Sequence, residues 1–419
     1  MSAPNEHAQM EPVAAPVAAH PVAVHFEDDL RRSRLLVFFR ILLALPHFVW
    51  LLLWSVVAFV VAIVNWVATL VRGVPPGALH RFLAAYVRYT IHVQAFVYLA
   101  ANPFPGFTGA AGRYPLDVEL PPPERQRRWT VLLRLPLAIP ALLVGGALAA
   151  LPTGGSGGSG GVAAAVAFLA WFAALVRARM PRGFRDLVVY ALNYAAQLES
   201  YLLLLTGRYP STDPLTVALP ELDVEHPVRL HHERELGRRR LTVFFRLFLL
   251  LPHIVWLALW TLAVVLAAIP AWIATLVIAR LPSAFARFFG AFIRYSAHVF
   301  AYGALIARPF PGFVGREGSY PLDIRIETPD RQNRWTVAFR VLLAVPALIV
   351  SGTVGNVLSV IAFLGWFVSL VRGRMPSGFV NAGAYVIRYH AQAYAYVLLL
   401  TRAYPHSSPA LERALVADA

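Results

Sequence analysis

The chain repeats itself at a spacing of 206 residues, and each copy is built around a long apolar block. Residues 36–47 and residues 242–253 both run from an apolar stretch through Phe-Phe-Arg to Leu-Pro-His. A weaker repeat, displaced by 94 residues, relates residues 38–46 to residues 132–140 inside the first copy. Repeated units of this size bury their apolar faces against their neighbours. We therefore divide the chain into four units over residues 23–113, 114–214, 226–319 and 320–407, and expect a disordered N-terminal tail at residues 1–22 and a C-terminal tail at residues 408–419.

The apolar blocks place these units in a membrane. Hydrophobic residues make up 58% of the chain and charged residues 14%, against roughly 45–50% and 25% in ordinary globular domains. The run from residue 35 to residue 71 is almost wholly apolar, with Arg40 and His47 and a few small polar residues as exceptions, and a bilayer needs about 20 apolar residues for each helical span. The composition therefore predicts an integral membrane protein.

Two residue types are missing, and their absence excludes several kinds of chemistry. All 37 basic residues are Arg, and the chain has no Cys, which removes lysine Schiff bases, cysteine nucleophiles, disulfides and cysteine-containing zinc sites. We also find no nucleophile elbow, no carboxylate pair within an apolar run and no His-Glu metal motif on a helix. The sequence thus predicts no catalytic residues, no cofactor and no metal.

The net charge of +15 could serve binding to nucleic acid or contact with anionic lipids. A nucleic-acid binder gathers its basic residues on one soluble face, whereas here Arg flanks the apolar runs. Such placement is typical of contact with anionic lipid headgroups. We expect membrane lipids as partners and no nucleic acid, and we leave open a protein partner or a homo-oligomer.

Each unit follows one order: an extended segment, an Arg-rich entry, the apolar block, an exit with Arg and Pro, and a third helix rich in aromatic residues. Apolar residues alternate with charged ones in the extended segments, which is the period of a half-buried strand. We therefore expect short extramembrane strands, forming a small sheet or pairs of strands, at residues 21–27, 114–120, 226–232 and 320–327.

The apolar block of 36–38 residues in unit one would be roughly 55 Å long as one helix, nearly twice the hydrocarbon thickness. Gly and Ser interrupt the block of unit two at residues 152–161, and residues 351–356 of unit four give a similar turn signal. We therefore predict a transmembrane helical hairpin in each unit, giving an all-α polytopic protein of eight spans. The best-defined spans are residues 131–151 and 162–177 in unit two and residues 336–350 and 357–372 in unit four.

Arginines at both feet of every hairpin predict the topology. By the positive-inside rule the feet and both termini are cytoplasmic. Four arginines lie one or two turns into the first span of each unit, where we expect their side chains to snorkel to the headgroups: Arg40, Arg134, Arg246 and Arg340. For His47 and His253, each directly after a proline, we expect a structural hydrogen bond.

Polar residues recur at spacings of seven, four and four along the third helix of each unit. These steps keep them on one helical face, although Phe96 replaces the last one in unit one. In one interpretation the third helices lie at the cytoplasmic interface. In the other they cross the bilayer, giving twelve spans, and line a permeation or binding path. The candidate residues, which we call the polar seam, are Arg88, His92, Asn193, Gln197, Arg294, His298, Arg388 and Gln392.

Several motifs resemble a known family. Phe-Phe-Arg-x-Leu-Leu-Ala-Leu-Pro-His at residues 38–47, and Pro-Phe-Pro-Gly-Phe at residues 103–107 and 309–313, are similar to the uncharacterised bacterial membrane family called domain of unknown function 4389, which is frequent in actinobacteria. Units one and three resemble it well, and units two and four more loosely. The resemblance implies a fold and a membrane location, and no catalytic residues.

Together these features predict a multi-pass protein of the bacterial inner membrane without enzymatic activity. We expect a membrane-organising, lipid-contacting or partner-scaffolding role. The first alternative is a channel or transporter whose path is lined by the polar seam. The second is a lipid-modifying enzyme.

Overall fold

The computed structural model describes residues 20–27, 29–148, 161–220, 226–233, 235–327 and 331–410. Within them each unit contributes a strand, then apolar helices, then a third helix of 21 residues. The strands are β1 (Ala23–Phe26), β2 (Leu116–Glu119), β3 (Val228–His232) and β4 (Leu322–Ile326), and the third helices are α3 (Gly77–Val97), α7 (Arg182–Leu202), α9 (Ser283–Gly303) and α12 (Ser377–Val397).

Long apolar helices fill the block of units one, three and four. Unit two divides its block between two shorter helices, and in three units a five-residue helix stands before the block. Among the described residues three helices are long and apolar enough to cross a membrane, which agrees with a membrane protein. The long helices are α2 (Arg40–Arg72), α8 (Arg240–Ile278) and α11 (Arg340–Arg372), the shorter pair is α5 (Arg134–Leu148) and α6 (Val162–Arg177), and the five-residue helices are α1 (Arg34–Phe38), α4 (Arg128–Leu132) and α10 (Arg334–Ala338).

The predicted hairpins are wrong in units one, three and four, because α2, α8 and α11 are continuous. In unit four the expected turn at residues 351–356 is helical. Ser351 Oγ hydrogen-bonds Nδ1 of His390 on α12 at 2.6 Å, and a Cβ at Gly355 would lie 3.3 Å from Nε2 of the same ring. These polar and small residues therefore serve close packing on α12, which outweighs the cost of about 1 kcal/mol for each glycine in a helix.

Unit two does not form a hairpin either. The Gly-rich segment falls mostly within residues 149–160, outside the described residues, but the helices on both sides are placed. Near the C-terminal end of α2, Trp66 Nε1 donates to the Val131 carbonyl of α4, while Trp171 Nε1 of α6 donates to the Val37 carbonyl of α1. The start of α5 and the end of α6 thus lie at opposite ends of α2, so α5 and α6 follow one another without reversing.

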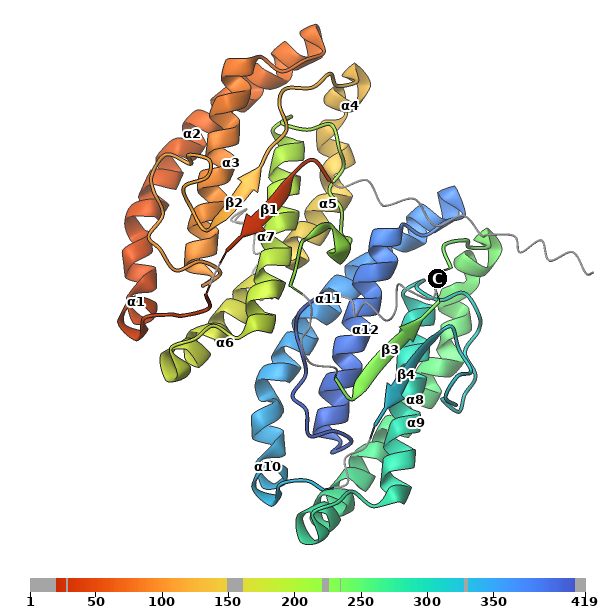
Figure 1. The fold of residues 1–419 in the computed structure, drawn as a ribbon. Coiled ribbons are helices and arrows are strands. Elements are labelled where there is room, and N and C mark those ends of the chain that lie inside the picture. Colours follow the sequence, from red (N-terminus) through yellow and green to blue (C-terminus); the bar gives the residue numbers. More distant parts are fainter. Residues whose placement is uncertain are drawn as a thin grey trace, which may run out of the picture.

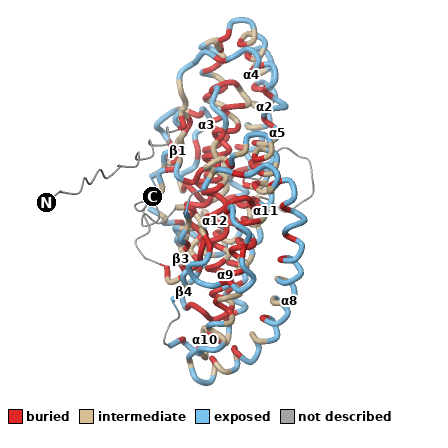
Figure 2. The backbone as a smooth tube through the Cα atoms, turned by 90° about the vertical axis from the view of Figure 1, so that its right-hand side faces the viewer, coloured by how far each residue is buried: buried red, intermediate tan, exposed pale blue. Residues whose placement is uncertain are grey.

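The third helices form the centre of a layered molecule (Figures 1 and 2). One of their faces is covered by the apolar helices α2, α5, α6, α8 and α11, and the other by the strands. Most side chains of α7 and α12 are buried. The core therefore runs through the third helices, where the sequence places its regular polar residues.

The strands form two antiparallel pairs, β1 with β2 and β3 with β4. Val24 lies opposite Val118 in the first pair, and Leu230 lies opposite Ile324 in the second. All four of these side chains are buried against the third helices. The predicted strand pairs are confirmed.

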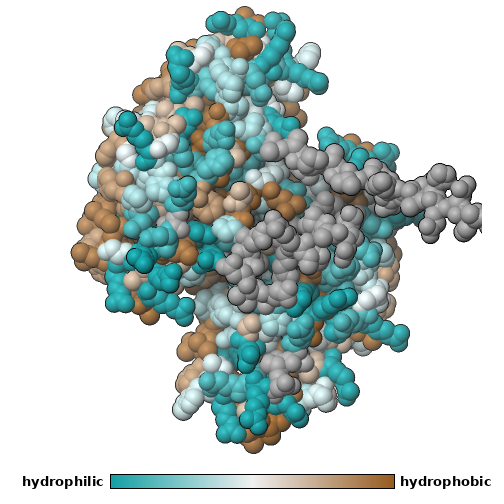
Figure 3. All heavy atoms as spheres, in the orientation of Figure 1, coloured by the Kyte–Doolittle hydropathy of each residue, from teal (hydrophilic) through white to brown (hydrophobic). Residues whose placement is uncertain are grey.

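The two outer faces of the molecule differ in chemistry. On the helix face, only 11% of the most apolar stretch of α2 is buried, and its outward Leu, Val and Phe side chains are exposed. On the strand face, hydrophilic side chains are spread over the surface and apolar ones gather toward the edges (Figure 3). A folded chain with one fully apolar face requires an apolar environment on that side.

Candidate functional site

The polar seam lies where the third helices meet the strands and the segments that follow the third helices. In unit one, Nε of Arg88 donates to the Val118 carbonyl at 3.1 Å, and Nε2 of His92 donates to Oδ1 of Asp117 at 3.1 Å. Burial of Asp117 opposes ionisation, but hydrogen bonds from His92 and from the backbone N–H groups of Gly112 and Val118 outweigh it and lower the pKa of this carboxyl. The seam thus fixes β2 on α3 by a charged contact.

Unit three repeats this arrangement. Nε of Arg294 donates to the Ile324 carbonyl at 2.9 Å, and its NH2 group contacts Glu317 at 2.8 Å. His298 donates to Asp323 at 3.0 Å, and the pKa of Asp323 is lowered, again because hydrogen bonds outweigh burial. The arginine–carbonyl and histidine–aspartate contacts are therefore shared by β2 and β4.

In unit two, amide side chains hold the segment around β1. Oδ1 of Asn193 accepts from the Val24 N–H at 3.0 Å. Nε2 of Gln197 donates to the Val22 carbonyl at 3.2 Å, while its Oε1 accepts from the Ser211 N–H at 2.9 Å. An amide both donates and accepts, so Gln197 links the chain before β1 to the segment after α7.

Unit four uses an arginine and a glutamine in the same way. NH2 of Arg388 donates to the Ser408 carbonyl at 2.6 Å. Gln392 donates to the Val228 carbonyl at 3.1 Å and accepts from the His406 N–H at 3.1 Å. All eight residues of the polar seam therefore bond the strands or the adjacent segments, and the channel alternative gains no support from these contacts.

The four arginines near the start of the apolar helices do not snorkel, so that prediction is wrong. Each is at most 2% exposed. Arg40 packs its guanidinium 4.5 Å from the ring centre of Phe96 and donates to the Phe96 and Ala101 carbonyls. An aromatic ring attracts a cation through its face, so Phe serves here as well as Tyr, and the exception at residue 96 is explained. The equivalent pairs are Arg134 with Tyr201, Arg246 with Tyr302 and Arg340 with Tyr396.

A second set of fourfold contacts was missed by the sequence analysis. Two residues after the end of each third helix lies a leucine with left-handed backbone, φ 62°, and a side chain from the preceding entry segment donates to that leucine's carbonyl. The backbone N–H of the same residue donates to the carbonyl that ends an apolar helix of the neighbouring unit. We call these residues staples because each joins two units: Arg32 binds Leu99 and Ala178, Gln126 binds Leu204 and Gly73, Arg238 binds Leu305 and Gly373, and Gln332 binds Leu399 and Ala279.

His47 forms a hydrogen bond as predicted, but its partner lies on another helix. Nδ1 of His47 lies 2.6 Å from the hydroxyl of Tyr89 on α3. Its ring packs between Phe104 and Phe107 of the Pro-Phe-Pro-Gly-Phe loop, with ring centres 4.4 and 4.5 Å away. Unit three repeats the arrangement around His253. The histidine and the loop form one packing unit, which explains why units two and four lack both.

Arginines gather where an entry segment meets the end of an apolar helix. In the first of these arginine clusters Arg31 pairs with Arg179 through a backbone bridge, and Arg34 donates to the Val176 carbonyl at 3.0 Å. A cation at a helix C-terminus is favourable because the last carbonyls are unpaired. The four clusters are Arg31, Arg32, Arg34, Arg177 and Arg179; Arg72, Arg125, Arg127 and Arg128; Arg238, Arg239, Arg240, Arg372 and Arg374; and Arg280, Arg331 and Arg334.

Among the described residues, no group of three or more His, Asp or Glu side chains could hold a metal ion.

With this geometry in place, the comparison with known families is informative. The family model called domain of unknown function 4389 matches residues 34–108 and 334–408. The family model therefore matches the chain twice. The first match runs from α1 through the loop after α3, and the second from α10 through the segment after α12. The sequence motifs placed the best resemblance in units one and three, whereas the matches fall in units one and four. No curated protein and no solved structure matches the chain.

Proposed function

We propose that this DUF4389 protein is a non-enzymatic membrane protein that lies flat in one leaflet, binds anionic phospholipids and organises the membrane around it. The observation that carries this proposal is the contrast between the two faces. Outward side chains on α8, such as Leu262, Leu266 and Ile269, are about 60% exposed. Opposite them, the strand face carries exposed charged residues such as Glu119. An element that is apolar on one side and polar on the other is suited to the plane of the interface.

A flat orientation also avoids burying charge in hydrocarbon. The 39 residues of α8 span about 58 Å, whereas the hydrocarbon core is about 30 Å thick. The strands lie beside the middle of the third helices, and α3 packs along α2 near Trp54. If α2 crossed the bilayer, the exposed pair His25 and Glu119 on the strands would enter the membrane, at a cost of roughly 2.5–3.5 kcal/mol for a charged side chain.

The arginine clusters are the basis for proposing that the protein prefers anionic lipids. They lie at both ends of the apolar helices, so a flat molecule holds all four at headgroup depth, where each Arg attracts anionic lipid by about 1 kcal/mol. Positive charge favours the cytoplasmic leaflet of a bacterial inner membrane. Both ends of the described chain lie on the strand face, since the Val22 carbonyl binds Gln197 and the Ala410 carbonyl binds Arg388. We therefore propose that both termini are cytoplasmic.

Thiol labelling tests this orientation, because the chain has no Cys. We would place single cysteines at Arg239 and Arg280, which flank the two ends of α8, and at His25 on the strand face. With a membrane-impermeant thiol reagent, all three should react in inverted membrane vesicles and none in intact cells. Reaction of only one of the two α8 sites in intact cells would place the ends of α8 on opposite sides and refute the flat orientation. Reaction of all three sites in intact cells would refute the cytoplasmic side.

A further inference from the structure

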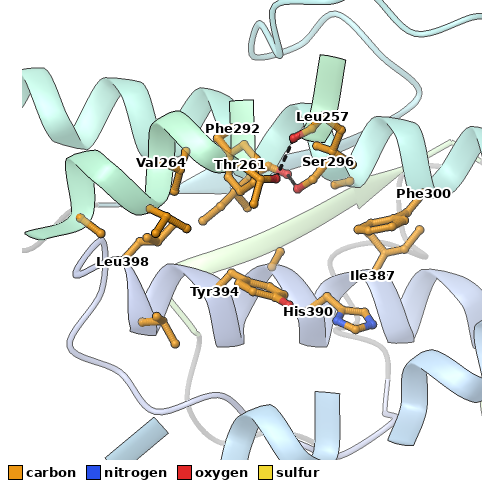
Figure 4. Close-up of a pocket in the computed structure, with 16 residues that line it drawn as sticks. Leu257, Thr261, Val264, Phe292, Ser296, Phe300, Ile387, His390, Tyr394 and Leu398 are labelled. Atoms are coloured by element: carbon orange, nitrogen blue, oxygen red, sulfur yellow. Dashed lines mark hydrogen bonds between the residues drawn. The ribbon is translucent and has the colours of Figure 1, made fainter. Parts of the chain in front are cut away.

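An apolar cavity of about 350 Å³ lies between α8, α9 and α12, on the side of α9 and α12 away from the strands (Figure 4). Its floor is made by Ile293, Ala297 and Ala391 of the two third helices, all of which are buried. Phe300 and Tyr394 stand at its mouth and are 41% and 43% exposed. A cavity of this size accommodates a ligand rather than single waters.

Three polar side chains of the lining form hydrogen bonds within the protein. Thr261 Oγ1 donates to the Leu257 carbonyl at 2.7 Å, and Ser296 Oγ donates to the Ile293 carbonyl at 2.8 Å. Nδ1 of His390 is paired with Ser351 as described above. The walls therefore present mainly carbon, and a polar ligand entering them would lose its hydration without replacement.

We infer that this cavity binds one acyl chain of a bilayer phospholipid. The inference rests on the proposed membrane orientation, because the mouth then opens among the acyl chains. Val265 lines the cavity and is itself exposed, and the next residue along α8, Leu266, belongs to the exposed apolar face. The cavity is thus continuous with the surface that meets lipid, and an acyl chain is the molecule available there that matches an apolar lining.

The first half of the chain provides a natural comparison. At the positions of Phe300 and Tyr394, offset by 206 and 195 residues, it carries Gln94 and Glu199. Both side chains have a buried oxygen without a hydrogen-bond partner, Oε1 of Gln94 and Oε2 of Glu199. An acyl chain entering there would meet two polar oxygens that it cannot hydrogen-bond. We therefore assign the acyl-chain site to the second half alone.

Photocrosslinking tests the assignment. The full chain is reconstituted in vesicles of phosphatidylglycerol and phosphatidylethanolamine that contain a phosphatidylcholine with a diazirine on one acyl chain, and crosslinked residues are mapped by mass spectrometry. We expect adducts on the floor residues Ile293, Ala297 and Ala391 as well as on the exposed Leu262 and Leu266.

Two substitutions at residues outside the buried core complete the test. Thr261→Phe narrows the mouth and should lower the floor adducts severalfold, whereas Ser55→Phe, its counterpart 206 residues earlier, should leave them unchanged. Adducts on Leu262 and Leu266 without any on the floor, or floor adducts that Thr261→Phe does not reduce, would overturn the acyl-chain site and leave the membrane orientation standing. Absence of adducts at Leu262 and Leu266 as well would refute both proposals.

Discussion

A glycine in the loop after α9 gives the sharpest test of the packing between the loops and the third helices. Gly315 has φ +61°, and a Cβ placed on it would lie 2.2 Å from the Ala291 carbonyl oxygen and 2.8 Å from the Tyr295 nitrogen, both backbone atoms of α9. Left-handed backbone costs a residue with a Cβ about 1–2 kcal/mol, and overpacking adds about 1–3 kcal/mol. Gly315→Ala should therefore lower the free energy of unfolding by about 2 to 5 kcal/mol.

Two neighbouring glycines separate these contributions. Gly318 has φ +68° and open space around it, whereas Gly312 has open space and ordinary backbone. Gly318→Ala should cost about 1–2 kcal/mol from the backbone alone, and Gly312→Ala less than about 0.5 kcal/mol. Equilibrium unfolding in mixed micelles, followed by far-UV circular dichroism, measures all three. If Gly315→Ala is no worse than Gly318→Ala, the loop does not touch α9 as described, and the reasoning fails.

Three further predictions concern titration, the staples and lipid preference. The pKa of His226 is lowered to about 4, by burial first and then by positive charge from Arg388. Unfolding therefore takes up a proton below pH 6.5, and the free energy of unfolding should fall by up to about 3 kcal/mol as the pH drops toward 4. In thermal melts, the stability of His226→Asn should decline less steeply with falling pH, whereas His231→Asn, a control at an exposed residue, should decline as the unmodified protein does. Gln332→Ala leaves the Leu399 carbonyl without its side-chain donor and should lower the free energy of unfolding by about 1–3 kcal/mol in the unfolding assay described above. An equal loss for the neighbouring Arg331→Ala would contradict the role of Gln332 as a staple. Replacing both Arg280 and Arg331 of the fourth arginine cluster by Ala should weaken the preference for spin-labelled phosphatidylglycerol over phosphatidylcholine by up to about 30-fold, from about 1 kcal/mol for each Arg. An unchanged preference would rule out the lipid role of that cluster.

The membrane class, the strand pairs and the common face of the polar seam were all predictable from composition and periodicity. The same features did not reveal whether the chain turns back within each apolar block or continues through it. Gly and Ser at residues 351–356 indicate a turn when read locally, yet they lie inside α11, because Gly355 admits the ring of His390 from a helix 35 residues further along the chain. Tertiary packing outweighs the low helix propensity of these residues, and tertiary contacts cannot be seen in a single sequence.

The prediction that the four arginines snorkel was wrong for a related reason. Arg40 sits 56 residues before Phe96, and only the packing of α3 on α2 brings the ring under the guanidinium. A signal for the staples was nevertheless present: Arg32, Gln126, Arg238 and Gln332 follow the spacings of 94 and 206 that define the units. Arg and Gln share a long stem with a side-chain N–H donor, so comparison of equivalent positions by chemistry would have found them.

The repeated contacts also indicate where a specific function can reside. Staples, arginine–aromatic pairs and the contacts of Trp66 and Trp171 join one unit to another or one layer to the next, and all recur fourfold, so they account for a scaffold and not for a ligand. Specificity requires a place where equivalent positions differ. The cavity side of the third helices offers such a place, with Phe300 and Tyr394 in the second half and Gln94 and Glu199 at the equivalent positions of the first half. If the acyl-chain site is correct, the duplication has therefore kept one framework and given its two halves different surfaces toward the membrane.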